Sequence, residues 1–102
     1  MNAKQEFIDA VGYKYLKCAF IQYAPSFYDE AERSFSLPIN YTAEQYSRFL
    51  ESLDFEYDNG YGSQELFGNI WFDDGTWSDR YEYDGSEMWD YHNCPTIPNH
   101  LQ

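Results

Sequence analysis

The sequence predicts an α+β fold, in which an amphipathic helix at about residues 42–53 packs on an antiparallel sheet. We expect this sheet to contain a C-terminal three-stranded meander plus one or two N-terminal strands. Apolar residues recur at helical spacing over residues 42–53, and two Asp-Gly pairs ten residues apart mark hairpin turns between strand-like segments. Aromatic residues make up 22 % of the chain and supply the apolar area that the core of a 102-residue protein needs. Because no linker or repeat interrupts it, the chain is predicted to form a single domain over residues 1–102.

The N-terminal part is predicted to contain a short helix and a central strand. Residues 3–11 place Phe7, Ile8 and Val11 on one side of a helix, and a glycine follows. Residues 14–23 are rich in aromatic and β-branched side chains and carry apolar groups on both faces. A strand with two apolar faces is typical of the interior of a sheet.

The next segments predict an edge strand and then the main helix. Residues 35–41 alternate apolar and polar side chains, and Pro38 lacks the N–H that a central strand would donate. Thr42 and Gln45 have the spacing of a capping box at the start of the helix over residues 42–53. The predicted buried side of this helix consists of Tyr46, Phe49, Leu50 and Leu53.

Two turns set the register of the predicted C-terminal meander. A two-residue turn at residues 74–75 joins its first two strands, and a second such turn at residues 84–85 joins the last two. The core face that follows from this register comprises Leu66, Gly68, Phe72, Trp77, Tyr81 and Tyr83. Arg80 then lies opposite Trp89 on the other face, where a cation–π contact is expected. Asp79 is left on the core face, so either its carboxylate reaches the rim or a bulge changes the register.

Negative charge is concentrated in the second half of the chain. Residues 51–102 carry twelve carboxylates and a single basic residue, Arg80, whereas residues 1–50 carry six acids and five bases. A folded acidic surface selects basic partners or cations and repels nucleic acid. We therefore expect the partner to be a basic, nucleic-acid-binding host protein, with no direct contact to nucleic acid or membrane. The predicted partner-binding residues are Asp54, Glu56, Asp58, Asp73, Asp74, Asp79, Glu82, Asp84, Glu87, Asp90, Trp71 and Trp89.

Asp54, Glu56 and Asp58 alternate with aromatic residues and form the most regular acidic motif. In an extended chain their side chains project from one face about 6.6 Å apart, because each residue rises about 3.3 Å. This spacing is about two axial phosphate steps of one duplex strand and predicts a mimic of the nucleic-acid backbone. Glu82 and Glu87, opposite each other in the second hairpin, would extend the acidic surface. A solvated face that serves only solubility stays the alternative.

Binding of a small ligand or a cation also stays open. Residues 54–65 partly follow the pattern of a calcium loop, although the glycine comes one position late. Trp71 and Trp89 beside carboxylates would suit a carbohydrate. His92 and Cys94 lack the second close pair of ligands that zinc needs, so no metal or cofactor is predicted. The chain contains no nucleophile elbow, phosphate loop or dinucleotide motif, and we do not expect an enzyme.

The cysteines and the apolar segments predict a reduced, soluble, cytoplasmic protein. Cys18 and Cys94 are too few for a disulfide framework, although a single bridge stays open. The first nine residues lack the apolar segment of a signal peptide, and no apolar run approaches the ~20 residues that span a bilayer. Monomer and homodimer both stay open, because exposed aromatic residues favour association and the net charge of −12 opposes it.

The block over residues 65–95 resembles a family of small uncharacterised proteins encoded by bacteriophages and prophages. The likeness rests on the segments IWFDDGTW at residues 70–77 and EYDGSEMW at residues 82–89. It implies a phage product that acts in the cytoplasm of a bacterial host, and it carries over no active site. Small acidic phage proteins are similar in character to anti-CRISPR and anti-restriction inhibitors, which is an analogy of class. Together with the charge, this analogy predicts an inhibitor of a bacterial defence system; a phage structural or interaction protein is the alternative.

Overall fold

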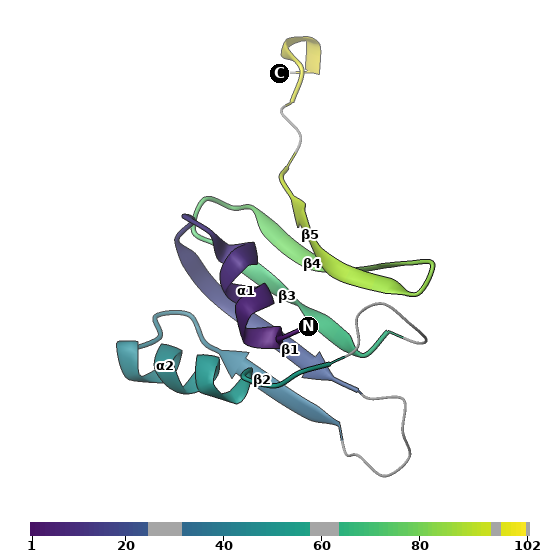
Figure 1. Cartoon of the computed structure of the whole chain (residues 1–102). Helices are drawn as coiled ribbons and strands as arrows, with labels where there is room; N and C mark the ends of the chain where they lie inside the picture. Colours follow the sequence, from purple (N-terminus) through teal and green to yellow (C-terminus); the bar gives the residue numbers. More distant parts are fainter. Residues whose placement is uncertain (25–31, 58–63, 95–96, 102) are drawn as a thin grey trace.

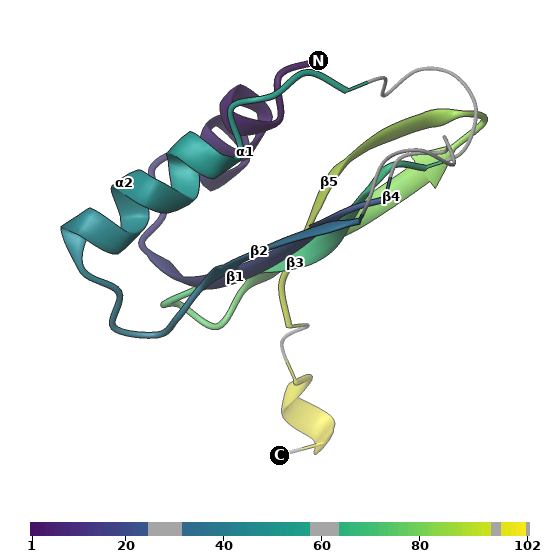
Figure 2. The same cartoon turned by 90° about the horizontal axis from the view of Figure 1, so that it is seen from below.

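The computed structural model describes residues 1–24, 32–57, 64–94 and 97–101. Within these ranges the chain forms a five-stranded antiparallel sheet of order β2-β1-β3-β4-β5, and both α-helices lie on the same face of it (Figures 1 and 2). The elements are α1 (Ala3–Val11), β1 (Leu16–Tyr23), β2 (Arg33–Leu37), α2 (Ala43–Ser52), β3 (Leu66–Phe72), β4 (Trp77–Tyr83), β5 (Ser86–His92) and the 3₁₀ turn η1 (Asn99–Leu101). The predicted α+β fold with an antiparallel sheet is confirmed. No helix in the described ranges is long and apolar enough to cross a membrane.

The two helices begin at caps that the sequence encodes. The side chain of Asn2 accepts a hydrogen bond from the Gln5 amide at 2.8 Å and starts α1. Thr42 and Gln45 form the predicted capping box at the start of α2, each side chain accepting from the other residue's amide. These bonds satisfy amides that have no partner within the helix. On α1, Phe7 is fully buried, whereas Ile8 is 37 % exposed.

We call the face of the sheet on which both helices lie the covered face (Figure 2). The core lies between the helices and this face. Phe7 of α1 and Phe49 of α2 meet edge to face with their ring centroids 5.2 Å apart. Full burial of one such aromatic side chain stabilises the fold by roughly 1.5 to 3 kcal/mol. The largest fully buried apolar side chains are Phe7, Phe72, Ile21, Leu37, Leu53, Leu66 and Ile70.

The strands of the N-terminal half occupy their predicted places in the sheet. β1 pairs with both β2 and β3, and β2 forms an edge that ends at Leu37, directly before Pro38. Where β3 pairs with β1, Gly68 lies opposite Ile21 with a φ of 145°, and a Cβ on it would lie 2.2 Å from the carbonyl oxygen of Phe20. Glycine at this position therefore allows the close approach of the two strands.

The register predicted for the first hairpin is wrong by one residue. Phe72 lies opposite Thr76, because the amide of Phe72 donates to the Thr76 carbonyl at 3.0 Å and the amide of Gly75 donates to the Phe72 carbonyl at 3.2 Å. The loop thus has three residues and ends on Gly75 at a φ of 86°, a known alternative to the two-residue turn. A slip of one residue exchanges the faces of a strand. Trp77 therefore lies opposite Trp71, away from the core.

The second hairpin has the predicted two-residue turn. Asp84 and Gly85 both have positive φ angles, 52° and 86°, as the favoured primed turn requires. Arg80 lies opposite Trp89 as expected, with the guanidinium 5.0 Å from the indole centroid. The corrected register moves this pair to the covered face, so Tyr81 and Tyr83 leave the predicted core and are exposed.

Candidate binding face

Figure 2 shows that both helices lie on one face of the sheet; we call the opposite face the open face. It carries a group of exposed apolar side chains. These residues alternate along the strands with buried residues of the core, so that they point away from α1 and α2. Their exposed fractions lie between 38 and 47 % for Phe20, Phe67, Trp71, Tyr81 and Met88. Aromatic groups on one exposed surface often mark a site of interaction.

A polar row crosses the open face between these apolar residues. The register places Asn69, Asp79 and Asp90 side by side on β3, β4 and β5. His92 Nε2 lies 2.8 Å from an oxygen of Asp79 and 3.4 Å from an oxygen of Asp90. The ring of Trp77 stacks on the imidazole of His92, with the centroids 5.6 Å apart. Two carboxylates that face each other across a strand pair repel, so the imidazole lies where a positive charge is most favourable.

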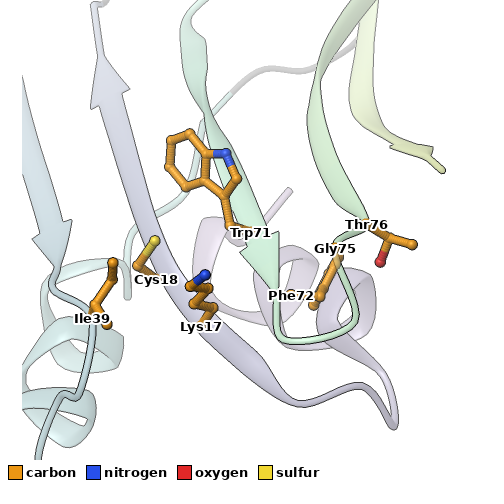
Figure 3. Close-up of a pocket in the computed structure, with 7 residues that line it drawn as sticks. All are labelled: Lys17, Cys18, Ile39, Trp71, Phe72, Gly75 and Thr76. Carbon is orange, nitrogen blue, oxygen red and sulfur yellow. The ribbon is translucent and has the colours of Figure 1, made fainter. Parts of the chain in front are cut away.

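One corner of the open face is hollowed between β1, β3 and the residues after β2 (Figure 3). The cavity has a volume of about 310 Å³, and Cys18, Ile39 and Trp71 line its apolar part. Lys17 lies at the same cavity, and burial raises the pKa of the Cys18 thiol above its ordinary value. A cavity of this size accommodates a single apolar group of a partner.

The covered face contains a charged network instead of a continuous apolar core near β4 and β5. The side chain of Arg80 is only 2 % exposed, and it donates to Glu87 at 2.7 Å and to Glu6 at 3.1 Å. It also donates to the hydroxyl of Tyr57 at 2.9 Å, and that hydroxyl donates to Glu6. We call these four residues the Arg80 network. It joins α1, the segment after α2 and the second hairpin.

The pKa values of the network follow from burial and from these contacts. Burial alone would lower the pKa of Arg80, but the surrounding acceptors outweigh it and raise the pKa above the ordinary value. Burial and the hydrogen bond to Glu6 raise the pKa of the Tyr57 hydroxyl well above its ordinary value. Arg80 therefore stays charged and Tyr57 stays neutral in the folded protein.

The prediction that Glu87 belongs to the acidic surface is wrong. Its carboxylate is buried, pairs with Arg80 and accepts the backbone amides of Glu65 at 2.8 Å and Leu66 at 3.0 Å. Trp89 also leaves the predicted site, because it packs against the core below Arg80. Since Arg80 is the single basic residue of residues 51–102, its burial leaves this half of the chain with no Lys or Arg side chain at the surface.

The described part of the acidic motif, residues 54–57, lies against the N-terminus. Asp54 accepts a hydrogen bond from the Asn2 side chain at 3.0 Å, and Glu56 lies 3.2 Å from the N-terminal amino group. Asp58 lies outside the described residues, as does half of the calcium-loop pattern over residues 54–65. Of the described carboxylates of this motif, Glu56 is thus paired with a positive charge, whereas Asp54 is hydrogen-bonded to a neutral amide.

The other predicted carboxylates lie at the two turns of the meander. At the first turn, Asp73 is exposed and Asp74 pairs with Lys14 at 2.8 Å. The hydrogen bond from Lys14 and, to a smaller extent, those from Thr76 hold the pKa of Asp74 well below its ordinary value. At the second turn, Glu82 accepts from the Gly85 amide at 2.8 Å, and Asp84 is exposed. β4 separates the turns by about 20 Å at ~3.3 Å per residue. The predicted carboxylates therefore form separate groups, with Asp79 and Asp90 between the two ends.

The open face brings together residues that the sequence analysis did not combine. Trp77 and His92 were not among the predicted site residues, yet they flank Asp79 and Asp90. The second hairpin gives the signal, because its turn alone sets residue 79 opposite residue 90 and residue 77 opposite residue 92. Comparisons with models of protein families, with curated proteins and with solved structures find no match to this chain.

Proposed function

We propose that this protein is a non-enzymatic inhibitor that binds a basic, nucleic-acid-binding surface of a bacterial defence protein through its open face. The observation that carries the proposal is the composition of that face, where exposed aromatic residues surround Asp79 and Asp90. The withdrawal of Arg80 into the interior supports it, because no Lys or Arg of residues 51–102 opposes a basic partner.

The two kinds of side chain have different tasks in such an interface. Aromatic residues such as Trp71 and Tyr81 supply apolar area and act as anchors that determine affinity. The carboxylates speed association with a positively charged surface and reject partners of the same charge. Carboxylates at the turns, Asp73 and Asp84, extend the negative potential to both ends of the sheet.

A carbohydrate is the second candidate ligand. The exposed indole of Trp71 on the flat open face would stack on a sugar ring, and Asn69 and Asp79 would accept or donate hydrogen bonds to its hydroxyls. Titration with oligosaccharides, followed by tryptophan fluorescence, tests this candidate. A saturable change that W71A abolishes would favour it over the inhibitor.

The test of the inhibitor begins with capture of a partner from a bacterial lysate at low salt and elution with a salt gradient. The purified partner is then measured for association rate at low and high salt, and for competition by duplex DNA. We expect duplex DNA to displace the protein and salt to slow association, because charges in water are screened beyond about 10 Å at 0.1 M.

Matched variants locate the binding surface. D79N/D90N removes two charges from the open face, and D9N/E51Q removes two exposed charges from the helices. We expect the first pair to slow association and the second pair to change it little. Equal effects of both pairs would show that only net charge matters, and a complex that DNA does not displace would refute the blocking of a nucleic-acid site.

A further inference from the structure

Three groups able to bind a metal converge on the open face at β4 and the edge strand β5. The carboxylate oxygens of Asp79 and Asp90 and a ring nitrogen of His92 all lie within 4.8 Å of one another. Asp79 and Asp90 are direct partners across β4 and β5, and His92 follows two residues after Asp90 on the same face. The side chains are 35 to 48 % exposed, so that an ion can reach them from solvent.

The separations of the ligand atoms, all below 4.8 Å, are near those around a first-row transition metal. Metal–ligand bonds of about 2.1 Å in a tetrahedral site put neighbouring ligand atoms about 3.4 Å apart. His92 Nε2 lies 2.8 Å from Asp79 and 3.4 Å from Asp90, so small rotations of the side chains suffice. The strands fix the three backbone positions, and the stacked ring of Trp77 restrains the imidazole.

We propose that Asp79, Asp90 and His92 bind a divalent transition-metal ion, for which Zn²⁺ is the reference probe. The imidazole nitrogen favours such an ion over Ca²⁺, which takes six to eight oxygen ligands. Two carboxylates and one neutral imidazole leave a coordination position for water. The ion takes the place of the direct contacts between His92 Nε2 and the two aspartates, and it cancels the repulsion between the facing carboxylates.

This site is independent of the proposed function, because it requires no protein partner. If both hold, the ion neutralises the two carboxylates of the open face and weakens binding to a basic partner. Metal binding is measured on the isolated protein, so its failure leaves the inhibitor proposal unaffected, and failure to find a partner leaves the metal site unaffected.

The experiment is a titration of the protein with zinc sulfate, followed by calorimetry and by tryptophan fluorescence, since Trp77 contacts the ligand His92. We expect saturation at one ion per chain, with D79N and H92Q each weakening binding by about 100-fold. E82Q removes an exposed carboxylate from the same hairpin and should leave the affinity unchanged.

The free thiol of Cys94 lies two residues after His92 and provides the decisive control. C94S should bind zinc as the wild-type protein does. Loss of binding in C94S with retention in D79N, or no saturable binding at all, would overturn the proposal. NMR of the wild-type protein makes the same test without a ligand-removing variant: zinc should shift the ring signals of His92 and leave those of His100, the second histidine of the chain, in place.

Discussion

Replacement of Arg80 with methionine should destabilise the protein more than any change at a surface ion pair. Methionine keeps most of the apolar length of the side chain but removes the charge and all of its donors. The variant leaves the carboxylate of Glu87, 2 % exposed, without the guanidinium at 2.7 Å. Glu6 and the backbone oxygen of Leu66 lose their bonds from the same group.

The expected magnitude follows from the burial of this pair. Removal of one partner of a buried ion pair costs about 3 to 5 kcal/mol, because it leaves an uncompensated charge in the interior. The free energy of unfolding of a small domain is only about 5 to 15 kcal/mol, so R80M should lose a large share of it. Arg48 and Glu44 give the matched control, since both side chains are more than 70 % exposed. R48M should cost less than about 1 kcal/mol.

Urea denaturation of both variants, followed by circular dichroism and tryptophan fluorescence, measures these differences. The slope of the unfolding free energy against urea should stay constant if the folded state is unchanged. The double variant R80M/E87L replaces both charges with apolar groups and should recover much of the loss. A loss of less than about 1 kcal/mol in R80M, equal to that in R48M, would refute the argument that the network is a buried and tightly coupled unit.

Three further predictions concern the backbone and the pH dependence of stability. G68A should lose more than about 3 kcal/mol of unfolding free energy, because the new Cβ meets the Phe20 carbonyl. G75A should lose only about 1 to 2 kcal/mol, because Gly75 has a left-handed φ but open space around it. Equal shifts of the melting temperature in the two variants would contradict this. The depressed pKa of Asp74 adds stability above its unfolded value of 3.8 that is lost as the pH falls, so an acid titration of D74N should show a smaller loss than wild type. Because the pKa of Tyr57 is raised in the folded protein, the unfolded chain releases the hydroxyl proton first, and the free energy of unfolding should fall as the pH rises above 10. Y57F should lack this part of the alkaline loss of stability. An alkaline stability profile of Y57F equal to that of the wild type would be evidence against the buried hydroxyl.

Local patterns of the sequence were sufficient to predict the elements that depend on local physics. The capping box at Thr42 and Gln45 starts α2, and the turn at residues 84–85 closes the second hairpin as expected. The strand predicted over residues 35–41 lies at the edge of the sheet as expected, but it ends at Leu37 because Pro38 cannot donate to a ladder. In each case the deciding contact lies within four residues, and no tertiary contact overrules it.

The first hairpin could not be predicted in this way, because residues 73–75 permit two turns. An Asp-Gly pair closes a two-residue loop, and the same glycine equally ends a three-residue loop at a left-handed φ. The contact of the Asp73 amide with the Tyr15 carbonyl at 2.9 Å, 58 residues away in sequence, accompanies the longer loop. The resulting slip exchanged the faces of Trp77 and Trp89 relative to the prediction, and with them the composition of the candidate site.

The predicted register placed Asp79 on the core face, and this placement of a carboxylate was a sign that the register was wrong. When a predicted register places a carboxylate on a core face, the register is more often wrong than the carboxylate is buried, because burial of an unpaired carboxylate is costly. Arg80, the neighbour that takes its place on the covered face, is also charged, but Glu6 and Glu87 compensate it there. The sequence alone did not reveal these partners, since Glu6 is 74 residues distant.

The Arg80 network also explains how β4 and β5 are held in the sheet from the covered face. The backbones of β3 and β4 pair only over residues 69–71 and 77–79. Toward the start of β3, side chains of the second hairpin provide the hydrogen bonds to its backbone. Arg80 donates to the Leu66 carbonyl at 3.3 Å, and Glu87 accepts a hydrogen bond from the Leu66 amide. These contacts hold β4 and β5 to β3 from the covered side. The open face at the same strands is then free of structural charge pairs with Lys or Arg, and Asp79 and Asp90 can face solvent, a partner or a cation.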